Sequence, residues 1–107
     1  MPAAKLMVLY PYPADVATFE RLYQEEHVPM AVKKLEGKTR FVATKVQSSP
    51  QGKPAFYRIA EVHFPSLEAL QACAASAGGK ETLAHASKIS TGGPPVLLIA
   101  EEQTFTF

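Results

Sequence analysis

The chain has 107 residues, of which 47% are hydrophobic and 20% charged, and its formal net charge is +1. This size predicts one globular domain with a modest core, and the near-zero charge excludes the electrostatic pull that draws basic proteins to nucleic acid or anionic membranes. The single cysteine, Cys73, excludes a disulfide framework within the chain and a metal site built on several thiolates. The first residues lack the basic start, long apolar run and cleavage site of a signal peptide, and no apolar run is long enough for a membrane span, so we expect a cytoplasmic protein.

The chain begins with a predicted strand and a predicted amphipathic helix. Lys5–Tyr10 is short and apolar, and the Pro-Tyr-Pro sequence after it must end a strand. Asp15 is a good N-cap for the helix. An apolar face then recurs at three- and four-residue steps, formed by Val16, Phe19, Tyr23, His27 and Met30. Pro29 should kink or end this helix, with a last turn before Gly37.

Two further strands and a second helix are predicted in the middle of the chain. Arg40–Gln47 alternates and is rich in β-branched residues, and Ala55–Phe64 has the strongest strand pattern in the chain. The turn residues between them predict a hairpin. Ser66 then caps a helix that we expect to end at Gly78-Gly79. Its expected apolar stripe is Leu67, Leu70, Ala74 and Ala77.

The last part of the chain is less regular. Lys80–Ser90 fits either a short helix or an ordered loop. Val96–Glu101 is an apolar strand, and its composition predicts that both of its faces are covered. The tail Thr104–Phe107 alternates like an edge strand and would expose two phenylalanines in a monomer.

The order strand–helix–strand–strand–helix–strand predicts an α+β, ferredoxin-like βαββαβ fold, with a four-stranded antiparallel sheet and two helices on one face. The other face of the sheet is then left bare. Both faces of Ala55–Phe64 carry apolar residues, because each of its two alternating rows mixes apolar and polar side chains. A sheet of this kind needs a second cover, and we expect a homodimer with the two sheets face to face.

Residues 19–29 have the spacing Phe-x-x-x-Tyr-x-x-x-His-x-Pro. This spacing is the most specific part of a resemblance to the EthD family of the dimeric α/β-barrel superfamily. The passage Ala60–Glu68, the Gly78-Gly79-Lys80 turn and the last apolar strand also resemble that family. The resemblance therefore covers nearly the whole chain and implies a single EthD-like domain over residues 1–107 that forms a dimeric α/β barrel.

The functions that the resemblance implies are diverse. The family is named for a protein required alongside a cytochrome-type monooxygenase in ether degradation. Relatives in the wider superfamily include lactone isomerases, polyketide cyclases, cofactor-free monooxygenases and haem-degrading enzymes. Fold alone does not choose among these activities, so an oxidoreductase in catabolism is one of several functions that fit.

His27 is the leading candidate for catalysis. It shares one helix face with Phe19 and Tyr23, which places its imidazole toward the sheet and partly away from water. Burial lowers the pKa of a histidine and a nearby carboxylate raises it, so the ring fits a general acid or base. The competing interpretation is a core histidine that is hydrogen-bonded to backbone and only supports the kink.

The other candidate residues line the expected ligand site. The hydroxyl of Tyr23 could orient a substrate oxygen, and Tyr10 ends the first strand near the pocket mouth; each could equally be an ordinary core tyrosine. Phe19 belongs to the same wall. Alternation along the third strand places Arg58 and Ala60 on the helix side, where Ala60 leaves room opposite His27 and Arg58 could bind an anion.

The remaining ionisable residues have weaker claims to chemistry. Glu61 and His63 are expected on the dimer face, where salt bridging is the simpler role. His85 falls in the uncertain segment and could be a solvated loop residue or part of a lid. The three histidines lack the spacing of metal ligands, no glycine-rich phosphate loop is present, and Cys73 fits inert helix packing. We therefore expect no metal and no cofactor.

Two functions fit these residues. One is a cofactor-free isomerase, cyclase or oxidoreductase in which His27 moves a proton on a compact, partly apolar metabolite bound between sheet and helices. The alternative is a non-catalytic accessory or binding protein that supports a partner monooxygenase. A purely structural dimer is the third possibility: Ala31 and Ala60 favour a cavity, whereas Phe19 and Phe64 oppose one.

Overall fold

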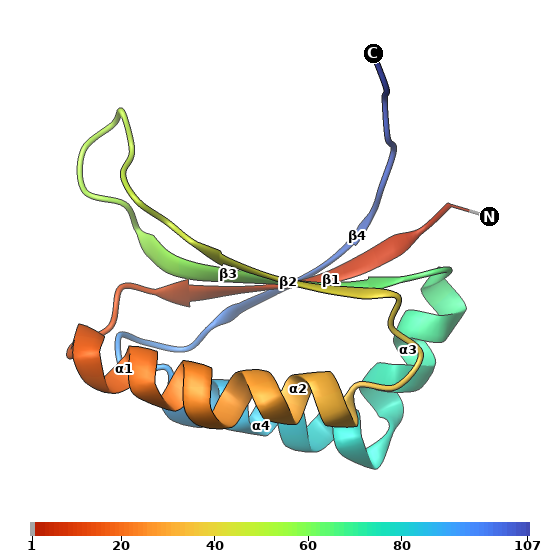
Figure 1. The fold of residues 1–107 in the computed structure, drawn as a ribbon, viewed down its shortest axis with the longest axis horizontal. Coiled ribbons are helices and arrows are strands. Elements are labelled where there is room, and N and C mark those ends of the chain that lie inside the picture. Colours follow the sequence, from red (N-terminus) through yellow and green to blue (C-terminus); the bar gives the residue numbers. More distant parts are fainter. Residues whose placement is uncertain (1) are drawn as a thin grey trace.

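A computed structural model describes residues 2–107. Its four strands form an antiparallel sheet in the order β2-β3-β1-β4, and every helix lies on one face of this sheet (Figure 1). The elements are β1 (Ala4–Pro11), α1 (Val16–Leu22), the π-helical turn η1 (Tyr23–His27), α2 (Val28–Lys34), β2 (Arg40–Lys45), β3 (Phe56–Phe64), α3 (Leu67–Ala75), α4 (Ala77–Ile89) and β4 (Val96–Glu101). The predicted ferredoxin-like fold is confirmed. No helix within residues 2–107 has both the length and the apolar character required to cross a bilayer.

The core lies between the sheet and the helices. Strand alternation sends every second side chain of β1 toward the helices, and this row is buried while the intervening residues are half-buried. The antiparallel register pairs Leu6 with Val62, Val8 with Ala60 and Tyr10 with Arg58. Both central strands therefore contribute one continuous helix-facing surface, as the alternation of β3 predicts.

The first helical segment does not end at Pro29. Asp15 caps it, as predicted, by accepting a hydrogen bond from the backbone N–H of Thr18 at 3.1 Å. The chain then widens into η1, where the N–H of Val28 donates to the carbonyl of Tyr23, and α2 continues with Pro29 in its first turn. A proline ring crowds the carbonyl four residues back, and the wider turn relieves this crowding without breaking the segment.

The π-helical turn also changes which side chains face the sheet. In an ideal α-helix, positions four residues apart drift by about 40° around the axis, so a column with this spacing soon leaves the core face. The wider turn reduces that drift, and Phe19, Tyr23, His27 and Ala31 are all buried. Met30, predicted on this face, is half-buried, and the extra residue in the turn brings Ala31 fully into the core.

The second helical segment also differs from the prediction. Gly78-Gly79 does not stop a helix; α3 ends before Ser76, and the two glycines lie in the first turn of α4. A Cβ on Gly79 would overlap the carbonyl of Cys73, and one on Gly78 would overlap the carbonyl of Lys34. Glycine is therefore required by close backbone approach, and the segment 80–90, left open between helix and loop, is helical.

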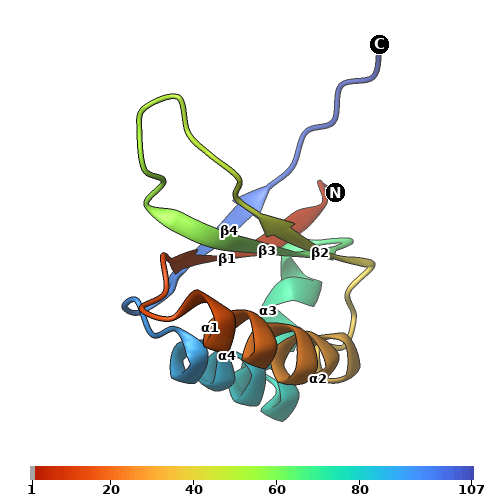
Figure 2. The same cartoon turned by 60° about the vertical axis from the view of Figure 1, so that its left-hand side comes forward.

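The last strand and the tail are less covered than expected. Strand β4 is an edge strand, and Val96, Leu97, Leu98 and Ile99 remain 39–59% exposed, so neither face of it is covered within one chain. Residues 102–107 form no strand. They leave the sheet on the side away from the helices, the same side to which the β2–β3 loop projects (Figures 1 and 2). The strand-like pattern of Thr104–Phe107 therefore forms no strand, because an edge strand must pair with a neighbour and none lies beside the tail within residues 2–107.

Candidate functional site

A cluster of rings fills the space between the first helical segment and β1. Phe19 and Tyr23 stack with their centroids 5.5 Å apart, and Tyr23 and His27 stack at 5.8 Å. Tyr10 of β1 meets all three of these rings edge-on, at centroid distances of 5.3, 5.5 and 6.2 Å. The i, i+4, i+8 spacing thus produces one ordered column of rings that packs against Tyr10. His27 is only 3% exposed within it.

His27 uses both of its ring nitrogens. Its Nε2 lies 3.1 Å from the hydroxyl of Tyr10, and its Nδ1 lies 3.0 Å from Nδ1 of His85 in α4. The two imidazoles are nearly coplanar, at 8°, and their centroids are 5.2 Å apart. This separation exceeds the N···N distance by roughly two ring radii, so the rings lie edge to edge, which is the geometry of a hydrogen bond and not of face-to-face stacking.

The buried pair is neutral at physiological pH. Burial, reinforced by the neighbouring His85, lowers the pKa of His27 to about 4. Burial, together with the nearby Tyr23, raises the pKa of Tyr10 far above its ordinary value, so its hydroxyl keeps its proton. Both shifts have the same cause, since a low-dielectric interior disfavours the charged form of either group. The site therefore holds an uncharged imidazole next to an uncharged phenol.

A narrow cavity adjoins His27. Its walls come from both central strands, from β2 and from the helices, and they are almost entirely apolar; they include Ala31, Ala60 and Ala86 beside the larger Phe41 and Leu83. The cavity volume is about 10 Å³, which admits one water molecule at most. The small residues predicted to leave room do line it. Their neighbours fill most of the space, so the cavity is much smaller than a metabolite.

Arg58 faces the helices, as its position in the alternation predicts, but its charge is matched inside the chain. Its Nη2 donates to both carboxylate oxygens of Glu20 in α1, at 2.9 and 3.0 Å, and the Tyr57 hydroxyl donates to Oε1 at 2.7 Å. Burial opposes ionisation of Glu20, yet the hydrogen bonds from Arg58 and Tyr57 prevail and lower its pKa. A ligand anion would have to compete with this carboxylate for the guanidinium.

Tyr23 lies beside this ion pair without joining it. The guanidinium carbon of Arg58 is 5.0 Å from the centre of the Tyr23 ring, a cation–π contact. Burial raises the pKa of Tyr23 to about 12. Its buried hydroxyl has no hydrogen-bond partner among residues 2–107. The predicted orienting hydroxyl is thus inside the core, close to the site but unpaired.

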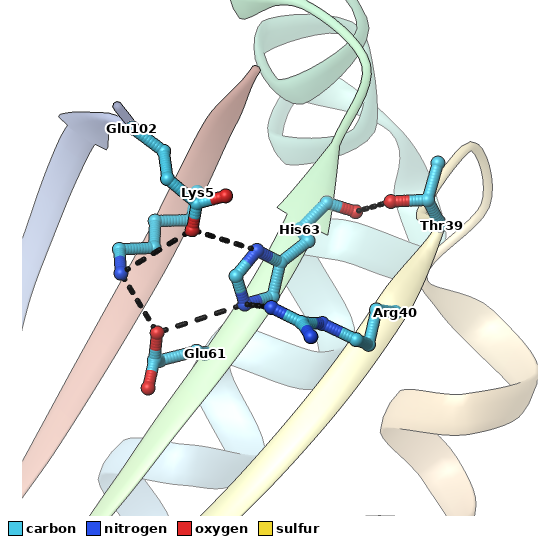
Figure 3. A network of polar contacts seen from close by, with 6 residues as sticks. All are labelled: Lys5, Thr39, Arg40, Glu61, His63 and Glu102. Atoms are coloured by element: carbon cyan, nitrogen blue, oxygen red, sulfur yellow. Dashed lines mark hydrogen bonds and ion pairs between the residues drawn. The ribbon is translucent and has the colours of Figure 1, made fainter. Parts of the chain in front are cut away.

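A second polar cluster lies on the other face of the sheet (Figure 3). Lys5 donates to Glu61 at 2.9 Å, and Nη2 of Arg40 lies 3.3 Å from Nε2 of His63. Nδ1 of His63 faces Glu102 at 3.5 Å. The hydrogen bond with Lys5 lowers the pKa of Glu61 and raises that of Lys5. Glu61 and His63 therefore lie on the open face, as predicted, and Glu61 is already ion-paired with Lys5 within one chain.

His85 lies closer to the candidate site than the sequence predicts. It belongs to α4 and not to a loop, and it points at His27. Thr82, Ala86 and Ile89 are buried along the same helix, and their three- and four-residue spacing is the signal that would have placed it. Within the described residues, no three side chains of the His, Cys, Asp and Glu types gather as metal ligands. Cys73 is buried, and burial raises the pKa of its thiol.

A wider hollow lies elsewhere on the surface. It has a volume of about 470 Å³, opens between the end of α2 and the start of α4, and is rimmed by Lys33, Lys34 and Glu81. Lys34 and Glu81 form an ion pair with each other there. This hollow is open to solvent and does not reach His27, so the narrow cavity remains the candidate site.

The sheet order and the placement of the helices define an α+β domain with a ferredoxin-like fold. Residues 12–88 match the family model described as the EthD domain, and the chain belongs to the EthD family. An uncharacterised 11.0 kDa protein of the thcB–thcC intergenic region of Rhodococcus erythropolis is 31% identical over 98 residues, covering 92% of this chain and 94% of that protein.

Solved structures agree with this assignment. An EthD family protein from Bacillus halodurans is 31% identical, with a TM-score of 0.88 over 94% of this chain and 99% of the other. An EthD-like protein from Ralstonia eutropha is 26% identical, with a TM-score of 0.72 over 94% and 92% of the two chains. The resemblance predicted from residues 19–29 and the strand passages is confirmed.

More distant likenesses concern the fold alone. A dimeric ferredoxin-like protein of unknown function from Jannaschia sp. is 14% identical, with a TM-score of 0.70 over 94% of this chain and 99% of the other. SnoaB, a cofactor-independent oxygenase from Streptomyces nogalater, is 11% identical, with a TM-score of 0.62 over 100% and 97% of the chains. The same fold thus occurs in dimers and in an oxygenase that works without a cofactor.

Proposed function

We propose that this protein binds a compact, partly apolar molecule between sheet and helices and moves a proton on it with His27 and Tyr10, without a cofactor, in a cytoplasmic catabolic pathway. The observation that carries the proposal is the neutral hydrogen-bonded pair, with Nε2 of His27 3.1 Å from the Tyr10 hydroxyl, in which His27 also lines an otherwise largely apolar cavity. Such a constellation of one acceptor and one donor is what a proton shift requires.

The two groups have complementary roles. The neutral imidazole can accept a proton at Nε2, and the Tyr10 hydroxyl can donate a hydrogen bond to a ligand oxygen that carries developing negative charge. A ligand oxygen that enters between them would meet both atoms at once. The apolar walls strengthen these interactions because they exclude water from the site.

Ligand entry requires the cavity to widen. Among the large side chains in its wall, Phe41 and Leu83 are the half-buried ones. Rotation of these two side chains would enlarge the cavity without moving the buried ring column. Binding therefore has to offset the cost of opening a packed core, which favours compact and partly apolar ligands.

An accessory role is the second candidate, and one observation favours it. With its pKa lowered to about 4 by burial, His27 is a weak base, whereas a general base works best when its pKa lies near the working pH. In that role the protein would hold an apolar metabolite, or support a partner monooxygenase, and the His27–Tyr10 pair would only recognise the ligand.

Either role is proposed for a homodimer. The open face of the sheet carries half-buried Met7, Leu9 and Ile59, and β4 beside it leaves a run of apolar residues exposed. Apolar surface of this extent on a small domain is typical of an interface. A second copy, related by a twofold axis, would cover it and would lie between the two projecting segments, the β2–β3 loop and the tail.

The test is a thermal-shift and turnover screen of lactones and aromatic ketones. A ligand that binds only the native state raises the melting temperature. His27→Gln and Tyr10→Phe alter the proposed pair, and His63→Gln is the matched control on the other face of the sheet. We expect at least one compound to stabilise the wild type and the control, and its turnover to fall about 100-fold in His27→Gln.

The remaining outcomes separate the candidates. Stabilisation of the wild type and the control without turnover would support the accessory role and contradict catalysis. Stabilisation by no compound in a broad panel, together with normal folding of every variant, would contradict catalysis and metabolite binding alike, because both require a ligand.

A further inference from the structure

A chain of polar contacts leads from His27 past the cavity toward the surface. Nδ1 of His85 is hydrogen-bonded to His27, and the other nitrogen of His85, Nε2, lies 3.6 Å from Oε1 of Glu26, which is beyond hydrogen-bond distance and can be bridged by one water. The side chain of His85 is 13% exposed and that of Glu26 is 54% exposed. Four side chains from three separate elements, β1, η1 and α4, therefore connect a fully buried hydroxyl to solvent.

The two ends of the chain fix the positions of its protons. Tyr10 is neutral, its hydroxyl is fully buried, and Nε2 of His27 is its hydrogen-bond partner, so Tyr10 donates and Nε2 accepts. His27 then carries its proton on Nδ1 and donates it to Nδ1 of His85. His85 consequently carries its proton on Nε2, where it points at the carboxylate of Glu26.

The opposite arrangement is disfavoured at both ends. It would leave the Tyr10 proton without an acceptor inside the core, which costs about 1–3 kcal/mol. It would also place the bare lone pair of His85 Nε2 against the negative oxygen of Glu26. Proton donation from Tyr10 outward satisfies both hydrogen bonds of His27 and turns the Nε2 proton of His85 toward Glu26.

We propose that His85 and Glu26 form a proton path that connects Nε2 of His27 with solvent. The inference rests on the proposed function only for the reaction that would use the proton. The path itself is a property of the ligand-free protein. It assigns His85 as a proton relay and Glu26 as the group that receives or supplies protons at the surface.

The path transfers one proton in balanced steps. When a proton binds to Nε2 of His27, the N–H bond at Nδ1 breaks and its proton moves to Nδ1 of His85. The N–H bond at Nε2 of His85 then breaks, and that proton passes to Glu26 or to water. One proton has entered and one has left, both imidazoles are neutral again, and each holds its proton on the other nitrogen.

This sequence accounts for a histidine that resists protonation yet could still take part in proton transfer. Holding a second proton is costly for a buried imidazole, but releasing one at Nδ1 while accepting one at Nε2 avoids a lasting positive charge. The other titratable groups that face His27 offer no such exit. Tyr10 is the buried end of the proton path, and the Tyr23 hydroxyl has no hydrogen-bond partner among the described residues.

The first test assigns the tautomers by ¹⁵N NMR of histidine-labelled, ligand-free protein at neutral pH. We expect His27 to be protonated at Nδ1 and His85 at Nε2. The opposite tautomer at either residue would overturn the path as drawn, because the chain would then have no continuous direction. No substrate is needed, so this result stands whether or not the proposed function holds.

The second test measures exchange of the His27 Nδ1 proton with solvent. His85→Phe keeps a flat ring of similar size and removes both relay nitrogens, and Glu26→Gln removes the surface carboxylate with little risk to folding. We expect exchange to slow about tenfold in His85→Phe, because only local opening then remains, and to slow less in Glu26→Gln.

Controls make the exchange result decisive. The imidazole of His63, on the open face, should exchange at the same rate in wild type and in both variants. Unchanged or faster exchange at His27 in both variants would overturn the proton path. If the path holds but the ligand screen finds no turnover, only the proposed chemistry fails.

Discussion

The two faces of the sheet each bury a histidine, and the two histidines have opposite surroundings. His27, on the helix side, meets a phenol and another imidazole, whereas His63, on the open side, lies among two carboxylates, a lysine and an arginine. Both rings are 5% exposed or less. Burial alone therefore does not define a site; the helix side keeps its groups neutral and the open side keeps its charges compensated.

The difference follows from how each face is covered. Helices seal one side with apolar residues and rings, so a charge there has no counterpart except in the Arg58–Glu20 pair. The open side has no cover within one chain, and long charged side chains shield His63 with their stems. A neutral, sealed cluster is suited to moving a proton, and a compensated cluster is suited to an interface.

The largest expected effect concerns the ring column. Phe19→Ala should lower the free energy of unfolding by about 3–5 kcal/mol, because it removes a fully buried ring that packs against three others. Ile59→Ala on the open face is the matched truncation and should cost clearly less. Urea unfolding of both variants measures the difference. Equal losses would show that the two faces are packed alike, contrary to the comparison.

The pH dependence of stability should reflect His27. Its pKa is about 4 in the folded protein and 6.5 as a free side chain, so between these values the unfolded chain binds more protons. Stability from this group is complete above pH 6.5 and is lost as the pH falls toward 4, by about 3 kcal/mol in all. Unfolding of wild type and His27→Gln across this range isolates the contribution.

Carboxylates also make the free energy of unfolding fall at low pH. Their contribution is the same in the wild type and in His27→Gln, so it cancels in the comparison. Glu20 and Glu61 both have a lowered pKa, so the stability they supply is also lost as the pH falls, in the wild type and in His27→Gln alike. Parallel pH profiles for the two proteins would mean that His27 is not held neutral by burial. Convergence of the profiles at low pH is the expected result.

The dimer prediction addresses the open side. Phe105 is 73% exposed in the tail, and Phe107, two residues further on, is exposed as well. If a second copy covers the open face, replacing both by serine should weaken dimerisation about 100-fold, since each ring contributes burial at the interface. Sedimentation velocity from nanomolar to micromolar concentration measures this. Val32→Ser, exposed on the helix side, is the control and should leave the dimer unchanged.

A monomeric wild type at micromolar concentration would contradict the dimer outright. A dimer that the double variant leaves intact would confine the interface to the sheet and β4. The effect of the double variant therefore decides whether the tail belongs to the interface or only projects beside it.

The sequence predicted the architecture better than the site. The order of elements and the strand alternation led to the fold, to the limits Val96–Glu101 and to the facing of Arg58 and Ala60, because these depend on local patterns. The response to Pro29 was not local: whether a proline kinks a segment or induces a wider turn depends on which residues the sheet holds in place. The same is true of Gly78-Gly79, whose need for glycine comes from backbone of α2 and α3.

The candidate site depends on contacts that no single segment specifies. His27 was found from its spacing and its neighbours, but His85 joins it across 58 positions of sequence. The size of the cavity was also out of reach, because it is the small remainder left after Phe41, Leu83 and their neighbours have packed. Pattern identifies which residues face inward, whereas packing decides which of them meet.

The smallest expected effect compares two buried hydroxyls of the ring cluster. Tyr23 has a hydroxyl with no partner among the described residues, whereas Tyr10 donates to His27. An unpaired buried hydroxyl costs about 1–3 kcal/mol, so Tyr23→Phe should raise the free energy of unfolding by about 1 kcal/mol, and Tyr10→Phe should lower it by a similar amount. Both variants keep the ring contacts, including that of Arg58 with residue 23.

Urea unfolding at neutral pH measures the two substitutions side by side. Opposite signs would show that Tyr23 is held by its ring and Tyr10 by its hydroxyl, which is the asymmetry expected if only Tyr10 belongs to the proton-transferring pair. A loss of stability in Tyr23→Phe would mean that its hydroxyl has a partner in solution, and Tyr23 would then return as a substrate-orienting residue beside His27.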